Sequence, residues 1–72
     1  MFKPEFEFTG TFLACNIAHP ISKNWVSVVG TFSGRAMAYS LELNGERHLL
    51  FTLENGSVAG IPISNRSALK VV

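Results

Sequence analysis

The chain has 72 residues, of which 47% are hydrophobic and 15% charged, and its formal net charge is +1. This length allows one small β domain, residues 1–72, whose core gives only marginal stability unless a disulfide, a metal or oligomerisation helps. One cysteine excludes an internal disulfide, and two histidines leave no structural zinc set. Oligomerisation is the remaining aid, and the near balance of charge argues against electrostatic steering of a partner.

The N-terminal segment, residues 2–14, alternates in hydropathy almost without error. Phe6, Phe8 and Phe12 share one side, while glutamates and threonines share the other. This period of two predicts a half-buried strand, bent or bulged at Gly10. Its phenylalanines are the natural cover for one face of a sheet.

A second strand is predicted at residues 25–32, after a loop at residues 18–24 that contains His19-Pro20. The next two residues, Ser33-Gly34, have the composition of a tight turn. Treated as a two-residue loop, this turn would place Gly30 opposite Met37 and continue the sheet into residues 36–43.

Two Asn-Gly dipeptides divide residues 36–63 into three apolar runs of strand length. Asn-Gly is the strongest short-range hairpin signal because both central residues of a type I′ turn need positive φ. At Asn44-Gly45 a two-residue loop sets Glu42 opposite Arg47, whereas a three-residue loop would oppose two glutamates. Opposite charges across a ladder are favourable, so the two-residue loop is predicted.

The same two-residue rule at Asn55-Gly56 pairs Leu53 with Val58 and Phe51 with Gly60. In this register both faces of the meander are apolar, although an antiparallel sheet with one wet side should alternate. Something must therefore cover each side.

The C-terminal residues 64–67 predict a polar turn, and residues 68–72 predict a short closing strand beside the first strand. The fold class predicted is all-β: a small antiparallel barrel or rolled sheet of five to six strands, with its meander at residues 25–63. This layout is similar to that of SH3-like and OB-like barrels in size and strand count.

No constellation of residues predicts catalysis, a metal site or a cofactor. His48 falls within an apolar row and is expected to be a packed histidine, and Cys15 a small buried hydrophobe. Glu5 and Glu7 share a solvated strand face, where neither carboxyl would be desolvated as hydrolases require. We therefore expect a protein that is not an enzyme.

The function expected is that of a protein-interaction module, homo-oligomeric, that works as a subunit, adaptor or inhibitor by occupying a surface. An accessory protein of a phage or plasmid would fit this description. The predicted interface is one apolar sheet face. Its residues are Trp25, Val29, Leu49, Phe51, Leu53, Val58 and Pro62. The alternative is that the chain's own termini cover this face and leave a plain monomeric barrel.

Two further functions stay open. Small barrels bind single-stranded nucleic acid through stacking aromatics and basic rims, but six cations offset by five glutamates give little field. A small ligand could also be held between subunits. The candidate contacts for both are Lys23, Trp25, Arg35, Tyr39, Arg47 and Arg66. The sequence shows no apolar run long enough to cross a bilayer and no export signal, so a cytoplasmic location without membrane contact is expected.

Overall fold

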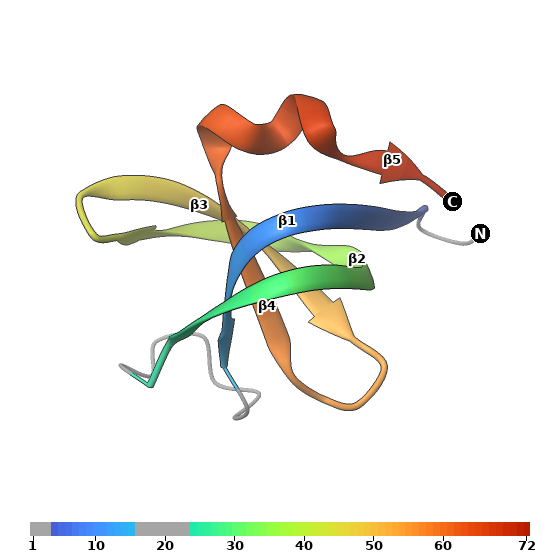
Figure 1. The fold of residues 1–72 in the computed structure, drawn as a ribbon, viewed down its shortest axis with the longest axis horizontal. Helices are drawn as coiled ribbons and strands as arrows, with labels where there is room; N and C mark the ends of the chain where they lie inside the picture. The colour runs from blue at the N-terminus through green and yellow to red at the C-terminus, as the bar shows by residue number, and fades with distance from the viewer. Residues whose placement is uncertain (1–3, 16–23) are drawn as a thin grey trace.

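The computed structural model describes residues 4–15 and 24–72. It contains five strands and one short 3₁₀ helix: β1 (Glu5–Cys15), β2 (Val26–Leu43), β3 (Glu46–Leu53), β4 (Val58–Pro62), η1 (Ile63–Ala68) and β5 (Lys70–Val71). All paired strands are antiparallel, and β1, β2, β3 and β4 form a ring because β1 pairs with both β2 and β4 (Figure 1). The predicted small all-β barrel is confirmed.

Strand β1 supplies the aromatic lining of the barrel, as its alternation predicts. Phe8 and Phe12 are buried, and both lie against Phe32 of β2 with ring centroids 5.8 and 4.8 Å away. Gly10 has φ of 148°, a conformation that favours glycine, and the Phe8 ring lies 3.2 Å from where a Cβ would stand. Glycine at position 10 thus lets β1 bend while the Phe8 ring packs against its backbone.

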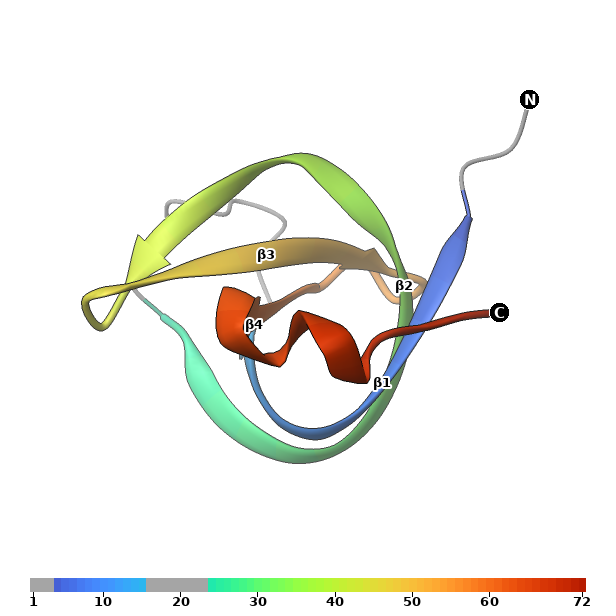
Figure 2. The ribbon, with the colours of Figure 1, turned by 90° about the horizontal axis from the view of Figure 1, so that it is seen from above.

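Strand β2 corrects the prediction of a turn at Ser33-Gly34. It runs without interruption through both residues; its first half pairs with β1 from Ala14↔Val26 to Glu5↔Arg35, and its second half pairs with β3. Figure 2 shows this strand curving around the barrel. The predicted pairing of Gly30 with Met37 is therefore wrong, because β1 and not residues 36–43 is the partner of the first half.

Glycine at position 34 has a different role from the one predicted. It lies opposite Phe6 of β1 and Leu53 of β3, at the point where β2 changes from pairing with β1 to pairing with β3. A Cβ at this position would stand 2.6 Å from the carbonyl oxygen of Thr52, closer than packed atoms tolerate. The strand needs glycine here for close backbone approach and not for a reverse turn.

The hairpin at Asn44-Gly45 forms as predicted. Glu42 lies opposite Arg47, and φ is 52° at Asn44 and 77° at Gly45, the positive values that a type I′ turn requires. Farther from the turn the register shifts, because β2 carries two more residues than β3 between the pairs Ser40↔Leu49 and Ala36↔Phe51. Phe51 consequently lies opposite Ala36 and not the predicted Ala38.

The second hairpin has a three-residue loop instead of the predicted two-residue loop. The Leu53 N–H donates to the Ser57 carbonyl at 2.9 Å, the Gly56 N–H donates to the Leu53 carbonyl at 3.1 Å, and Gly56 has φ of 88°. The Asn55 side-chain oxygen accepts the Ser57 N–H and fixes this turn. The register of β4 is therefore shifted by one residue, which exchanges its two faces.

Both sides of β3 and β4 are apolar, as predicted, and both are covered by this chain. The interior side packs against the phenylalanines of β1 and β2. On the outer side Leu50, Val58 and Cys15 are nearly inaccessible, and the Trp25 ring lies 3.7 Å from where a Cβ of Gly60 would stand. The prediction that one face stays open for a partner is thus not met.

The C-terminal segment follows the predicted order of a polar turn and a short strand. β5 pairs with the beginning of β1 through Phe6↔Val71 and Glu7↔Lys70, and the Val72 N–H donates to the Glu5 carbonyl at 2.8 Å. The ring itself is closed elsewhere, where the end of β1 pairs with β4.

Two glycines of β2 form a matched test of this architecture. Gly34→Ala should lower the free energy of unfolding by about 1–3 kcal/mol, because the new methyl group meets the Thr52 carbonyl. The methyl group of Gly30→Ala meets no atom of the described residues within 4 Å, and this change should raise stability by about 0.5 kcal/mol, since it reduces the freedom of the unfolded chain. Urea unfolding of dilute protein measures the stability of both variants, and equal effects would contradict the close approach of the β2 and β3 backbones at Gly34.

Candidate protein-interaction edge

The residues predicted to form one interface are divided by the structure. Phe51 and Val58 are each only 2% exposed, and Phe51 packs edge-on against Phe6 with ring centroids 5.9 Å apart. Neither can touch a partner in this fold. Leu49 and Leu53 are half-buried and pack against the core.

The remaining predicted interface residues keep some exposure. Val29 is 80% exposed on β2. Trp25 and Pro62 are half-buried, at the start of β2 and the end of β4. Of the seven residues, Val29 alone is a large hydrophobic side chain that solvent reaches almost completely.

Two aspartate substitutions separate core from surface. Phe51→Asp should unfold the protein, with a loss above about 4 kcal/mol, because it buries a carboxylate among phenylalanine rings. Val29→Asp should leave the fold intact. Far-ultraviolet circular dichroism and thermal unfolding distinguish the two, and a folded Phe51→Asp protein would contradict the assignment of this side chain to the core.

The backbone of β2 is unpaired along one side of its first half. The Val72 N–H donates to the Glu5 carbonyl, so the backbone groups of Glu5 point toward β5 and those of the next residue, Phe6, point toward its partner Gly34 on β2. The pairing of β1 with β2 is regular from Gly34 to Val26, so alternate residues of β2 counted from Gly34 point their N–H and C=O groups toward β1. Ser27, Val29 and Thr31 then point away from β1, where no strand of the described residues lies beside them.

We call this side of residues 26–33 the open edge. Residues 26–34 include no charged side chain and no proline, which are two of the features that protect exposed edges. Val26 and Val28 are exposed here as well as Val29. An uncharged, unpaired strand of this kind is a template for pairing with another chain.

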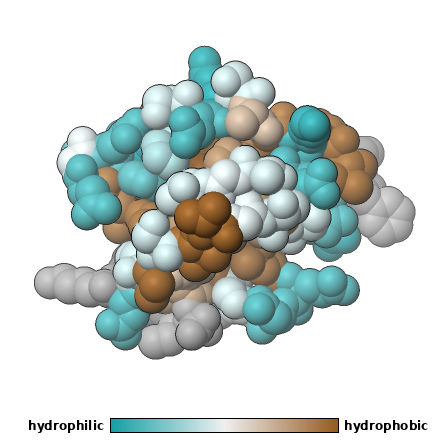
Figure 3. Space-filling view, viewed as in Figure 1, coloured by the Kyte–Doolittle hydropathy of each residue, from teal (hydrophilic) through white to brown (hydrophobic). Residues whose placement is uncertain are grey.

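The outer surface beside the open edge is rich in hydroxyl groups. Thr9 and Thr31 lie opposite each other with their hydroxyl oxygens 2.8 Å apart, and Thr11 lies opposite Val29. In Figure 3 the middle of the face over β1 and the first half of β2 is pale with a dark brown projection, and both hydrophilic and hydrophobic residues lie around it. The open edge therefore adjoins an uncharged outer surface around Val29 and Thr31, and the charge of Glu7 lies farther along, opposite Ser33.

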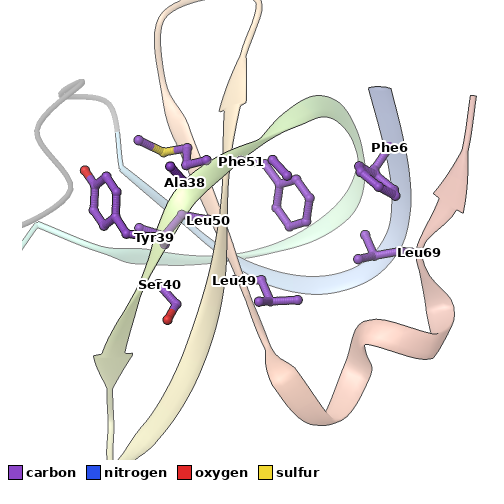
Figure 4. A pocket seen from close by; sticks show the side chains of 10 residues that line it. Phe6, Ala38, Tyr39, Ser40, Leu49, Leu50, Phe51 and Leu69 are labelled. Atoms are coloured by element: carbon purple, nitrogen blue, oxygen red, sulfur yellow. The ribbon is translucent and has the colours of Figure 1, made fainter. Parts of the chain in front are cut away.

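A second feature is an apolar groove beside the irregular part of β2 (Figure 4). Its volume is about 320 Å³, near the lower end for sites that hold small ligands. The shift in register between β2 and β3 contributes residues 36–40 to one wall. Its lining includes Phe6, Tyr39, Ser40, Leu49 and Leu69.

The cations predicted for nucleic-acid contacts are dispersed. Arg35 lies opposite Glu5 in the ladder of β1 and β2, and Arg47 lies opposite Glu42 while its guanidinium donates to the Ser40 hydroxyl at 3.2 Å. Arg66 belongs to η1, and Lys23 lies outside the described residues. Of the six predicted contact residues, Tyr39 lines the groove. Ser40, the hydrogen-bond partner of Arg47, lines it as well.

His48 is 4% exposed, and its Nδ1 atom lies 2.8 Å from the Glu46 carbonyl oxygen. Because a carbonyl only accepts, Nδ1 carries the proton and donates it. The Glu46 carboxylate in turn accepts the Ser64 hydroxyl at 2.9 Å. The bond from Nδ1 orients the His48 ring, as expected for a packed histidine.

Cys15 is completely buried, as expected of a small hydrophobe. Among residues 4–15 and 24–72 no three histidine, cysteine or acidic side chains are grouped to hold a metal ion. The other histidine, His19, lies outside these ranges. In the same ranges no helix is long and apolar enough to cross a bilayer.

Comparison with known proteins adds no functional information: no family model, no curated protein and no solved structure matches this chain. The open edge was not predicted from the sequence. The signal that could have found it is the nine-residue run without charge at residues 26–34, placed beside a first strand long enough to pair with all of it.

Proposed function

We propose that this protein is a non-enzymatic protein-interaction module that binds through the open edge of β2. The observation that carries this proposal is the alternation of backbone groups, which leaves Ser27, Val29 and Thr31 without a strand neighbour on that side among the described residues. Strand addition supplies affinity through main-chain hydrogen bonds and specificity through alternate side chains. A chain that binds in this way acts as a subunit, an adaptor or an inhibitor.

The rest of the described molecule supports a scaffold role. The phenylalanine rings of the described residues pack in the core, where Phe32 contacts both the rings of β1 and Phe51 of β3. His48 is engaged with the backbone of its own strand, without a side-chain nucleophile hydrogen-bonded to it among the described residues. The large exposed hydrophobic residues include three valines within four positions of β2, at the proposed edge.

Capture experiments with two lysine variants test the proposal. Val29→Lys places a charge beside the open edge, whereas Val71→Lys changes a valine that is 68% exposed on β5, away from the edge. A protein that binds wild type and Val71→Lys should be lost from Val29→Lys, because lysine on an edge opposes strand addition. If both variants retain the same bound proteins, the open edge is not the binding site.

The apolar groove supports a second candidate function, the binding of a small apolar ligand. Ala38 is exposed and contributes to the groove, so Ala38→Arg should reduce binding of an apolar fluorescent probe such as anilinonaphthalene sulfonate. The control is Ala68→Arg, another exposed alanine that is not part of this lining. Equal probe binding by the two variants would remove the groove as a ligand site.

A further inference from the structure

We infer that the open edge of β2 pairs with the same edge of a second copy of this chain, antiparallel about a two-fold axis at Val29. This inference rests on the proposed function and names its partner. A two-fold pair is isologous, so one strand must be complementary to itself when it is reversed. Four features of residues 26–33 support this condition: the direction of the backbone groups, the position of the crossing at Gly34, the glycine at position 30 and the character of the side chains.

The direction of the backbone groups restricts the possible registers. In an antiparallel pair, residues directly opposite each other either both point toward the partner strand or both point away. Ser27, Val29 and Thr31 point outward, so outward residues must be matched with one another. Placing Val29 opposite Val29 of the second copy sets Ser27 opposite Thr31, and the two copies can exchange main-chain bonds at each of these pairs.

The change of partner along β2, from β1 to β3 at Gly34, favours this register over registers centred nearer Ser33. Ser33 precedes Gly34, where β3 joins β2 through Leu53. A partner strand centred nearer Ser33 would approach this junction. Centring the pair on Val29 keeps the contact within residues 27–31 and clear of β3.

Gly30 gives an observation that is independent of the direction of the backbone groups. It lies in the middle of a regular part of β2 with no positive φ, and a Cβ built on it meets no atom of residues 4–15 or 24–72 within 4 Å. In the described chain, Gly30 thus has neither the positive φ of Gly10, its partner on β1, nor the close backbone contact of Gly34. In the proposed pair Gly30 lies opposite Val28 of the second copy, which is exposed in the single chain. A glycine within a strand is typical of a place where another chain approaches closely.

The side chains are compatible with self-pairing. Along residues 26–34 no charge is present, so reversing the strand opposes no like charges. On the outer face Val29 meets Val29, a pair of β-branched residues, and the hydroxyls of Ser27 and Thr31 can hydrogen-bond. The contact is short, so we expect a weak and reversible dimer whose population rises with concentration.

Light scattering and cysteine cross-linking test the pair on the full chain. The wild type and Val71→Lys should shift from monomer to dimer between about 10 µM and 1 mM, while Val29→Lys stays monomeric at the top of this range. Val29→Cys should form a disulfide-linked dimer on mild oxidation, because the two positions face each other across the axis. Val71→Cys and Ser27→Cys are the controls, since neither position would lie opposite its own copy. The native Cys15 thiol is buried and does not interfere.

The outcomes separate this inference from the function on which it rests. A dimer that Val29→Lys abolishes, with cross-linking strongest at position 29, supports the inference. A wild type that stays monomeric throughout, or cross-links equally at positions 29 and 71, overturns it. If that monomer still captures another protein that Val29→Lys loses, the proposed function stands with a different partner; if it captures none, both fail.

Discussion

The close approach of two backbones at Gly34 is the constraint on which the rest of this barrel depends. It lets one strand, β2, serve β1 with its first half and β3 with its second. The space between the Gly34 Cα and the Thr52 carbonyl is too small for any side chain. Because β2 changes neighbours at this point, each half of it has one paired side and one side left without a strand neighbour in the described part of the chain. The closed core and the open edge thus have the same origin.

Local sequence patterns predicted an element correctly where the pattern is compatible with a single backbone structure. The alternation of β1 and the charges of Glu42 and Arg47 each fixed an element correctly. The signal failed where two solutions shared the same residues. Asn55-Gly56 fits both a two-residue turn and the last two positions of a three-residue turn, and the choice depends on the bond from Leu53 to Ser57.

The candidate site was less predictable than the fold, because it depends on which strands become neighbours. Serine and glycine at positions 33 and 34 have the composition of a turn, and only the long pairing with β1 reveals a continuous strand. Reading a turn there paired residues 26–32 with residues 36–43 instead of with β1 and concealed the open edge. It also left Phe51 without cover, although the rings of Phe6 and Phe32 enclose it. Val29 remained a predicted interface residue in spite of this error.

The barrel covers its own core and leaves the backbone hydrogen-bonding groups on one side of residues 26–33 without a strand partner among the described residues. Amide hydrogen exchange, resolved by residue in dilute protein, tests this claim most directly. The amides of Val28, Gly30 and Phe32 should exchange slowly because they bond to β1, while those of Ser27, Val29 and Thr31 exchange quickly. Slow exchange of both sets in the dilute monomer would contradict the account, since it would show that the edge is already covered.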